Sequence, residues 1–225
     1  MDYFSLIKQK PELFRNDKRI FGILTNSQVI KRWVDKKNNS LREKGLPKAW
    51  GDIGVILDDP YIVVIRDLIK FPNGHAGGYL RLINKSELQG GTSVVILPEY
   101  RDKLVLQLIF RHPQREWSWE IPRGFGEPNL SAEHNVRKEI REEIQGEISH
   151  LCDLGIYYSN TGLDGNKINL FYAKLKSVGK ANINEGIKKI RYVTVSKFEK
   201  MIRESEIKDG FTIAAYARAK LRELI

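Results

Sequence analysis

Apolar and polar positions follow different patterns along the chain, and these patterns predict its organisation. Residues 1–50 are largely polar and helical in pattern, with a breaker at 44–47 near the end of this stretch. Short apolar runs typical of strands come next, at residues 54–57, 61–66 and 79–82. Turns are expected at 72–74 and at Gly77 and Gly78, since these residue types favour turns. We therefore expect an N-terminal helical segment with a small β-sheet over residues 1–90.

A second set of apolar runs begins after Gln89, Gly90 and Gly91. Strands are predicted at residues 93–97, 104–110, 168–173 and 190–195, and a helix is predicted at 213–224. No internal repeat or low-complexity linker divides this part further. These elements are expected to form a second domain over residues 91–225.

Another helix is predicted directly after Ser131, which is a favourable N-cap residue. Val136, Ile140 and Ile144 recur at every fourth position, as one stripe that a helix would bury. Glu133 falls in the positively polarised first turn, where a carboxylate stabilises the helix.

Three glutamates on this helix, Glu139, Glu142 and Glu143, fall within about a third of its circumference. Clustered carboxylates repel one another unless a cation lies among them, and Mg²⁺ or Mn²⁺ prefers carboxylate oxygens and substrate phosphates. The alternative is a solvated helix face, helped by a pair between Lys138 and Glu142. The preceding residues favour the metal site, because the glycine-rich stretch 121–126 lets backbone approach a metal or phosphate closely.

This segment resembles the signature of the Nudix hydrolases, G-x5-E-x7-R-E-U-x-E-E-x-G-U, in which U is apolar. Counted from Gly124, the match includes Ile140 and the complete glutamate trio, which in the family binds metal. Leu130 replaces the first glutamate, Lys138 replaces the arginine and Gln145 replaces the late glycine. In the family the first glutamate mostly supports the loop and helix, so its absence bears on activity more than on fold.

The resemblance extends beyond the signature. Residues Phe110-Arg111-His112-Pro113, Asn160-Thr161-Gly162-Leu163 and the segment 206–212 look like those of the ADP-ribose pyrophosphatase branch of the family. It implies that Arg111 contacts substrate phosphate and that Arg123 offers its backbone carbonyl to the metal. Without the resemblance, Arg111 is equally well interpreted as a solvated strand end. In the branch, N-terminal strands form a small sheet that helps the protein dimerise and supplies aromatic residues to stack on the nucleobase. Tyr79 is the candidate by position, and cross-strand packing is its alternative role.

One departure from the branch concerns the general base. The loop after residues 160–163 usually supplies a glutamate that acts as base or orients the attacking water, and Asn166 holds that position here. An amide cannot accept the proton. Asp164 and Glu185 are the carboxylates that could serve instead, and we favour Asp164. Its alternative role is that of a turn residue, since Asp favours turns.

Composition limits the remaining possibilities. An apolar content of 41% can bury a sizeable core, and the single cysteine, Cys152, excludes an internal disulfide and suits a reducing compartment. No apolar run approaches membrane-spanning length, and the N-terminus lacks a signal-peptide core. A cytoplasmic location and no membrane partner are therefore expected.

The formal charge of +10 raises the possibility of nucleic-acid binding. Lys and Arg are scattered along the chain, however, without zinc-ligand spacing or an RNA-binding aromatic motif, so nucleic acid is disfavoured as a partner. The densest basic patch, Lys31, Arg32, Lys36 and Lys37, is interpreted as the solvated face of a helix. A basic surface can equally attract an anionic pyrophosphate substrate.

Together these features predict an α/β protein, a Nudix α/β/α sandwich with an N-terminal helical and β extension, assembled as a homodimer. The implied function is Mg²⁺-dependent (or Mn²⁺-dependent) hydrolysis of a nucleoside diphosphate linked to another group, with ADP-ribose or an ADP-sugar favoured as the small-molecule substrate. The predicted metal ligands are Arg123, Glu139, Glu142 and Glu143; the catalytic residues are Glu142, Glu143 and Asp164; the substrate contacts are Arg111 and Tyr79. The alternative is a nucleotide-binding or sensing module that has lost turnover, suggested by Leu130 and Asn166.

Overall fold

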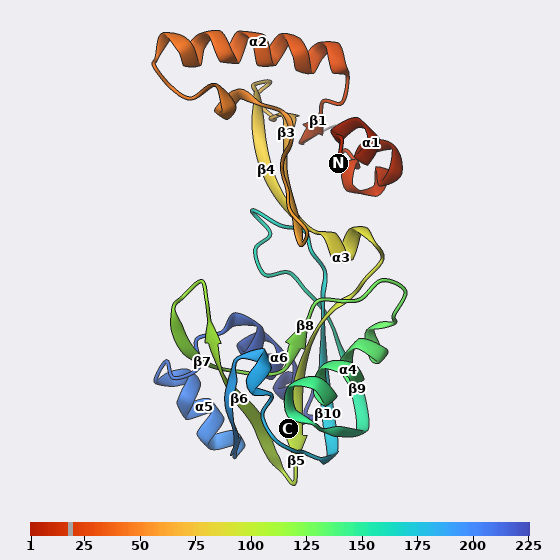
Figure 1. Ribbon diagram of the computed structural model, residues 1–225, viewed down its shortest axis with the longest axis vertical. Coiled ribbons are helices and arrows are strands. Elements are labelled where there is room, and N and C mark those ends of the chain that lie inside the picture. The colour runs from red at the N-terminus through yellow and green to blue at the C-terminus, as the bar shows by residue number, and fades with distance from the viewer. Residues whose placement is uncertain (18–19) are drawn as a thin grey trace. The chain divides into compact units, whose positions relative to one another are not determined.

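The computed structural model describes residues 1–17 and 20–225, and the chain divides into two compact units (Figure 1). Unit 1 comprises Met1–Leu88 together with Asn160–Gly165. Unit 2 comprises Gln89–Ser159 and Asn166–Ile225. The short segment 160–165 therefore packs with the N-terminal part of the chain, although the strands on either side of it belong to unit 2.

Unit 1 is built on an antiparallel sheet in which β3 (Ile62–Lys70) is central. One edge of β3 pairs along its length with β4 (Ala76–Asn84), and the other edge pairs in succession with β2 (Gly54–Asp58) and β1 (Gly22–Ile23). Helical elements accompany this sheet: α1 (Tyr3–Gln9), η1 (Pro11–Phe14), α2 (Ser27–Glu43), η2 (Lys48–Gly51) and α3 (Lys85–Leu88). Figure 1 shows α2 lying across the end of the sheet where β4 begins.

The core of unit 1 includes alternate residues of β3, of which Val63 and Ile65 are fully buried. Asp67 follows on the same face and is also buried. Its carboxylate accepts hydrogen bonds from the Tyr3 hydroxyl at 2.7 Å and from Arg81 Nε at 2.6 Å. A buried charge is tolerated only when it is paired and hydrogen-bonded, so these two contacts account for an acid in this core.

The turn predicted at 72–74 is confirmed, since Gly74 N donates to Phe71 O at 2.9 Å. The turn predicted at Gly77 and Gly78 is wrong, because both glycines lie within β4 and pair with β3. The side chain of Arg66 on β3 lies against Gly78, where an added Cβ would come within 2.7 Å of Arg66 Cδ. These glycines therefore make room for neighbouring side chains instead of reversing the chain.

Unit 2 is built on a sheet of seven strands: β5 (Ser93–Tyr100), β6 (Lys103–Arg111), β7 (Glu116–Glu120), β8 (Arg123–Gly124), β9 (Glu147–Tyr157), β10 (Ile168–Ser177) and β11 (Ile187–Val193). The strand order is β11-β6-β5-β10-β9, with β7 paired to β6 and β8 paired to β5. The β5–β10 pair is parallel, and the other pairs are antiparallel. β5 is thus the central strand that positions β8.

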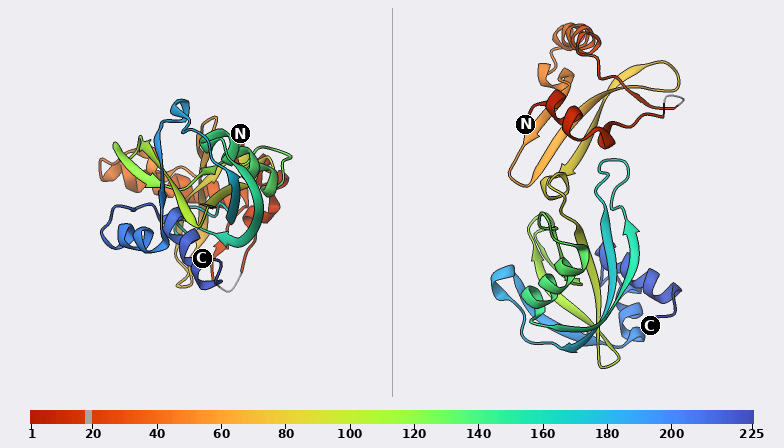
Figure 2. Two further views of the ribbon diagram at one scale, coloured as in Figure 1. Left: turned by 90° about the horizontal axis from the view of Figure 1, so that it is seen from below. Right: turned by 90° about the vertical axis from the view of Figure 1, so that its right-hand side faces the viewer.

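Helices cover both faces of the unit 2 sheet (Figure 2). Val94 and Ile96 of β5 pack with the buried stripe of α4 (Ala132–Ile144). Val95 and Leu97, which alternate with them, pack with residues of α5 (Val195–Arg203) and α6 (Gly210–Leu221). Because successive side chains of a strand point to opposite faces, these two clusters form two cores around one sheet. The predicted α/β/α sandwich with an N-terminal helical and β extension is confirmed.

A 3₁₀ helix, η3 (Ile183–Glu185), completes unit 2. Among the described residues, every helix is too short or too polar to cross a membrane.

Candidate active site

Helix α4 places two of its glutamates side by side in unit 2. The helix begins as predicted, with the Ser131 hydroxyl accepting from His134 N at 3.3 Å. The stripe of Val136, Ile140 and Ile144 is fully buried. Glu139 and Glu143, one turn apart beside that stripe, are only 9% and 7% exposed.

Glu142 points away from this pair. Its carboxylate lies 3.4 Å from Lys138 Nζ, in the i,i+4 pair considered as the alternative role of these acids, and its side chain is about half exposed. Its backbone carbonyl accepts from Asn182 Nδ2 at 3.0 Å. Of the three predicted glutamates, the structure therefore brings two together.

Gly124 of β8 is the residue that lets Glu139 approach the sheet. A Cβ built at Gly124 would lie 2.0 Å from Glu139 Oε1, closer than any real side chain allows. β8 is held at this point by its antiparallel pairing with β5, Gly124 opposite Val94. The glycine that opens the predicted signature thus has a physical reason, since only glycine leaves space for the carboxylate.

Glu143 is held from two sides by hydrogen-bond donors. Gln107 Nε2, on β6, donates to Glu143 Oε2 at 2.9 Å, and Arg123 N, on β8, donates to the same oxygen at 3.2 Å. The predicted backbone ligand Arg123 is therefore beside Glu143. Gln107 Oε1 is buried and has no hydrogen-bond partner within the described part of the chain.

Burial makes both carboxylates unusually weak acids. Desolvation raises the pKa of Glu139 from 4.5 to about 7, with nearby Lys138 opposing the shift and Glu142, Glu185 and Glu127 adding to it. Desolvation likewise raises the pKa of Glu143 to about 8; the Gln107 hydrogen bond opposes this shift, and the neighbouring Glu139 charge adds to it. Both carboxylates keep their protons to a higher pH than usual because burial removes the water that would stabilise their negative charge.

A divalent cation fits this environment. No three His, Cys, Asp or Glu side chains of residues 1–17 and 20–225 form a ready-made metal group, because Glu142 lies apart. The available donors are the two buried carboxylates and the unpaired Gln107 Oε1, all of them oxygens, which hard cations such as Mg²⁺ prefer. A cation among them would stabilise the charged carboxylates, whose pKa values are raised mainly by burial and further by neighbouring acids.

Arg111 belongs to a chain of charged groups next to this pair. Its guanidinium donates two bonds to Glu120 Oε2, from Nε at 2.9 Å and from Nη2 at 2.6 Å, and Glu120 is only 1% exposed. Arg123 Nη2 lies 3.1 Å from the same oxygen. Arg123 Nη1 also donates to Asp209 Oδ1 at 3.0 Å, and its guanidinium lies over the Phe211 ring.

Asp209 is the N-cap of α6 and accepts from Thr212 N at 2.8 Å. The N-terminus of α6 is thereby tied through Arg123 to β8.

Sequence reasoning missed Gln107, Glu120 and Asp209. Gln107 and Glu120 are register partners across the β6–β7 pair, and both interrupt apolar surroundings, which is the one local signal that could have selected them. Asp209 could have been recognised as an N-cap, because Asp is a favoured cap residue and lies just ahead of the helical pattern. The helix was instead predicted to begin at residue 213. The contacts that make these residues part of the site join separate elements, so no local pattern reveals them.

Lys138, which stands in the arginine position of the signature, joins the loop to the helix. Its Nζ lies 2.6 Å from Glu127 Oε1, in the loop before α4. The resemblance assigns such loop support to a glutamate at the position of Leu130, and Glu127 provides a carboxylate three residues earlier. Gln145, in place of the late glycine, is the C-cap of α4 with a left-handed φ of 50°, a conformation that glycine adopts more readily.

The remaining predicted residues lie in other surroundings. Tyr79 is in unit 1, where its hydroxyl donates to Gly162 O at 3.0 Å. Asp164 also belongs to unit 1 and forms a parallel β-bridge with Leu82 of β4. Asn166 is buried in unit 2. Glu185, the other carboxylate considered as base, lies in η3 of unit 2, near enough to Glu139 to raise its pKa.

Comparison with known proteins adds a relative and a solved structure. No protein-family model matches the chain. The chain is 25% identical over 191 residues to a protein named ADP-ribose pyrophosphatase from Bacillus subtilis (strain 168), and the match covers 83% of this chain and 97% of that protein. A crystal structure titled ADP compounds hydrolase superposes with a TM-score of 0.64 at 16% identity, over 76% of this chain and 89% of the other. The structural match concerns the fold, and the sequence match extends over both units.

The comparisons confirm the predicted resemblance to the ADP-ribose pyrophosphatase-like Nudix hydrolases and the prediction that the chain is an enzyme of this kind.

Proposed function

We propose that this ADP-ribose pyrophosphatase-like Nudix hydrolase cleaves the pyrophosphate bond of a nucleoside diphosphate linked to another group, using Mg²⁺ or Mn²⁺. The observation that carries the proposal is the buried Glu139–Glu143 pair against Gly124, which needs a cation to be stable in its charged form. ADP-ribose or an ADP-sugar is the favoured substrate. This choice rests on the relative named ADP-ribose pyrophosphatase and on the neighbour named ADP compounds hydrolase.

The side chains of unit 2 have separate tasks in this proposal. Glu139 and Glu143 would hold the metal together with the Arg123 backbone carbonyl, and Glu142 would join them by turning away from its pair with Lys138. When bound, the metal neutralises pyrophosphate charge and lowers the pKa of a water molecule. Arg111 offsets charge that develops on the departing phosphate, and Glu120 orients its guanidinium through the paired hydrogen bonds.

The proposed reaction is the hydrolysis of a pyrophosphate. The oxygen of water forms a bond to one phosphorus of the pyrophosphate, the bridging P–O bond breaks, and the water proton passes to a base. The products are two phosphate monoesters. We propose Asp164 as the base, because Asn166 cannot accept a proton and Asp164 is the only carboxylate in residues 159–167. Tyr79 is proposed to stack on the nucleobase.

A second function has support from particular residues. Leu130 and Asn166 replace two glutamates of the family pattern, which favours a nucleotide-binding or sensing module without turnover. We also place the protein in the cytoplasm, since its single cysteine suits a reducing compartment.

A substrate panel tests the proposed function. Purified protein is incubated with Mg²⁺ and ADP-ribose, ADP-sugars, dinucleotides or capped RNA, and phosphate monoesters are measured. We expect the ADP-ribose or ADP-sugar arm to be hydrolysed fastest, with no turnover after chelation. Tight binding of the same compounds without any product would favour the sensing module, and preferred hydrolysis of capped RNA would overturn the substrate class.

A further inference from the structure

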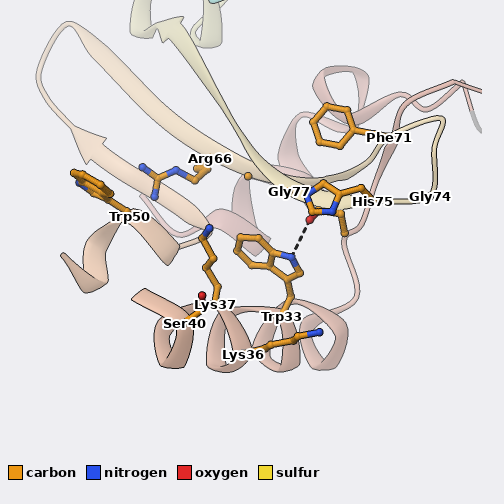
Figure 3. Close-up of a pocket in the computed structure, with 12 residues that line it drawn as sticks. Trp33, Lys36, Lys37, Ser40, Trp50, Arg66, Phe71, Gly74, His75 and Gly77 are labelled. Carbon is orange, nitrogen blue, oxygen red and sulfur yellow. Dashed lines mark hydrogen bonds between the residues drawn. The ribbon is translucent and has the colours of Figure 1, made fainter. Parts of the chain in front are cut away.

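Unit 1 contains a cavity that the proposed hydrolysis does not use. It has a volume of about 770 Å³ and lies between α2, η2 and the β3–β4 hairpin (Figure 3). Its lining residues are Trp33, Lys36, Lys37, Ser40, Trp50, Arg66, Phe71, Gly74, His75, Ala76, Gly77 and Gly78. All of them belong to unit 1, and a cavity of this size accommodates a small organic ligand.

The charged groups of this cavity have one sign. Lys36, Lys37 and Arg66 line it, and none of the described lining residues is an acid. No carboxylate in the described part of the chain forms an ion pair with these three side chains. In Figure 3, Lys37 extends from α2 towards the sheet, between Trp33 and Arg66. Unneutralised cations around a concave surface attract an anion.

The Arg66 guanidinium is fixed in place within the cavity. Its Nη1 donates to Ala49 O at 2.9 Å and to Asp52 O at 2.8 Å. These acceptors are neutral carbonyls, so they orient the guanidinium and leave its positive charge uncompensated. Gly78 makes this position possible, because any larger residue would meet the Arg66 side chain.

Aromatic rings supply the rest of the wall. Trp33 is anchored by a bond from its Nε1 to Ala76 O at 3.1 Å, and Phe71 stacks on His75 with an interplanar angle of 24°. Trp50, at the other end of the cavity, is 56% exposed, although indole is a large apolar group that normally packs. An exposed ring beside cations suits a flat aromatic ligand that carries negative charge.

We propose that this cavity binds a nucleotide, with the base stacked on Trp50 or Trp33 and the phosphate paired with Lys37 and Arg66, while Lys36 adds positive charge at the rim. The phosphate explains the uncompensated cations, and the base explains the exposed ring. The basic patch of α2 was predicted to be a solvated helix face. In this proposal two of its members, the lysines that line the cavity, attract the phosphate instead. The ligand recognised is a nucleoside phosphate, either as a free mononucleotide or as one nucleotide of a single-stranded nucleic acid. The proposal is independent of hydrolysis in unit 2.

Calorimetry on the full chain in chelator tests the ligand class. The probes are AMP, adenosine, inorganic phosphate and a short adenine oligonucleotide. We expect AMP or the oligonucleotide to bind with an affinity that falls as salt rises. Adenosine alone and inorganic phosphate alone should bind far more weakly. Saturation by AMP assigns a free nucleotide, whereas binding by the oligonucleotide alone assigns a strand. Equal binding of phosphate and AMP, or no binding of either nucleotide probe, would overturn the proposal.

Substitutions and crosslinking place the ligand. Lys36→Glu with Lys37→Glu should weaken binding by about tenfold or more, because two charges near a phosphate are reversed. Lys31→Glu with Arg32→Glu, on exposed positions of α2 outside the cavity, is the matched control. Azido-AMP should label peptides from residues 33–50 or 66–78 in the control and not in the Lys36/Lys37 variant. Equal affinity of the two double variants, or label confined to unit 2, would contradict the site.

Discussion

At the scale of single residues, Glu139 and Glu143 were identifiable from the sequence because their spacing and the apolar stripe beside them are local properties of one helix. The residues that surround the two glutamates could not be identified in this way. Gln107 on β6 and the backbone N–H of Arg123 on β8 donate to Glu143. Gly124, also on β8, leaves space for the Glu139 carboxylate. These contacts depend on strand pairing, which local periodicity does not encode.

The raised pKa values of these two glutamates predict how stability depends on pH. In the unfolded chain both groups lose their protons near 4.5, whereas folded Glu139 and Glu143 keep theirs up to about 7 and about 8. As pH rises, both groups therefore ionise in the unfolded chain before they do in the folded protein, and this favours unfolding. In chelator, the free energy of unfolding should fall from about pH 4.5 to about pH 8, by up to about 8 kcal/mol for the two groups together, and level off above.

Urea unfolding across this pH range measures the effect. Glu143→Gln removes one of the two titrating groups, so its decrease should be smaller, and saturating Mg²⁺ should reduce the decrease in the parent protein. The control is Glu133→Gln, an exposed acid on the same helix. A parent and a Glu143→Gln variant with the same pH dependence would contradict the assignment.

A second residue-scale prediction concerns the base. If Asp164 accepts the proton, Asp164→Asn should lower turnover by roughly 10² to 10⁴ and change its pH profile. Glu185→Gln is the comparison, because Glu185 is the other candidate and lies near Glu139. Turnover of both variants across pH at fixed Mg²⁺ decides between them. An Asp164→Asn enzyme with the parent's rate and profile would refute the role of Asp164, and a loss in Glu185→Gln alone would assign the base to η3.

At the scale of elements, the sequence predicted α4 and its N-cap correctly because cap and stripe are both local signals. It did not predict β9 or α5. β9 has an irregular burial pattern, several register shifts against β10, and Gly155 at a φ of +87°, so simple alternation is lost along the longest strand. The helix α6 begins at Gly210, three residues before the predicted start, because Asp209 caps it.

The short element β8 yields the element-scale prediction. Gly124→Ala should displace Glu139 from its place against the strand, since the new Cβ would lie 2.0 Å from Glu139 Oε1. We expect turnover to fall at least about tenfold and the Mg²⁺ requirement to rise, because metal ligands tolerate little displacement. Gly22→Ala, where nothing lies within 4 Å of the added Cβ, is the control. Steady-state rates over a Mg²⁺ titration measure both effects, and unchanged kinetics in Gly124→Ala would argue against Glu139 as a ligand.

At the scale of the whole molecule, the apolar runs separated an N-terminal part from a C-terminal part. They could not reveal that segment 160–165 packs within unit 1, because its contacts, among them the bridge between Asp164 and Leu82, join residues far apart in sequence. Segments far apart in sequence that meet through backbone pairing leave no periodic signal.

The β2–β3 region of unit 1 motivates a prediction of assembly. Ile56 and Leu57 are exposed, and Tyr61 is 77% exposed, although apolar strands normally need a covering surface. We expect a homodimer in solution, with a mass near twice that of the 26.0 kDa chain by light scattering. Tyr61→Lys with Leu57→Lys should shift the mass towards the monomer, whereas a monomeric parent at micromolar concentration with full activity would exclude the dimer.

The central claim is metal-dependent cleavage of a pyrophosphate at the Glu139–Glu143 pair. Phosphorus NMR of ADP-ribose, incubated with the parent protein and with Glu143→Gln at saturating Mg²⁺, tests it most directly. The account predicts that the parent replaces the pyrophosphate resonances with those of two phosphate monoesters, and that Glu143→Gln, folded by circular dichroism, is slower by about 100-fold or more. Equal rates in the two proteins, or an unchanged pyrophosphate with the parent, would contradict it.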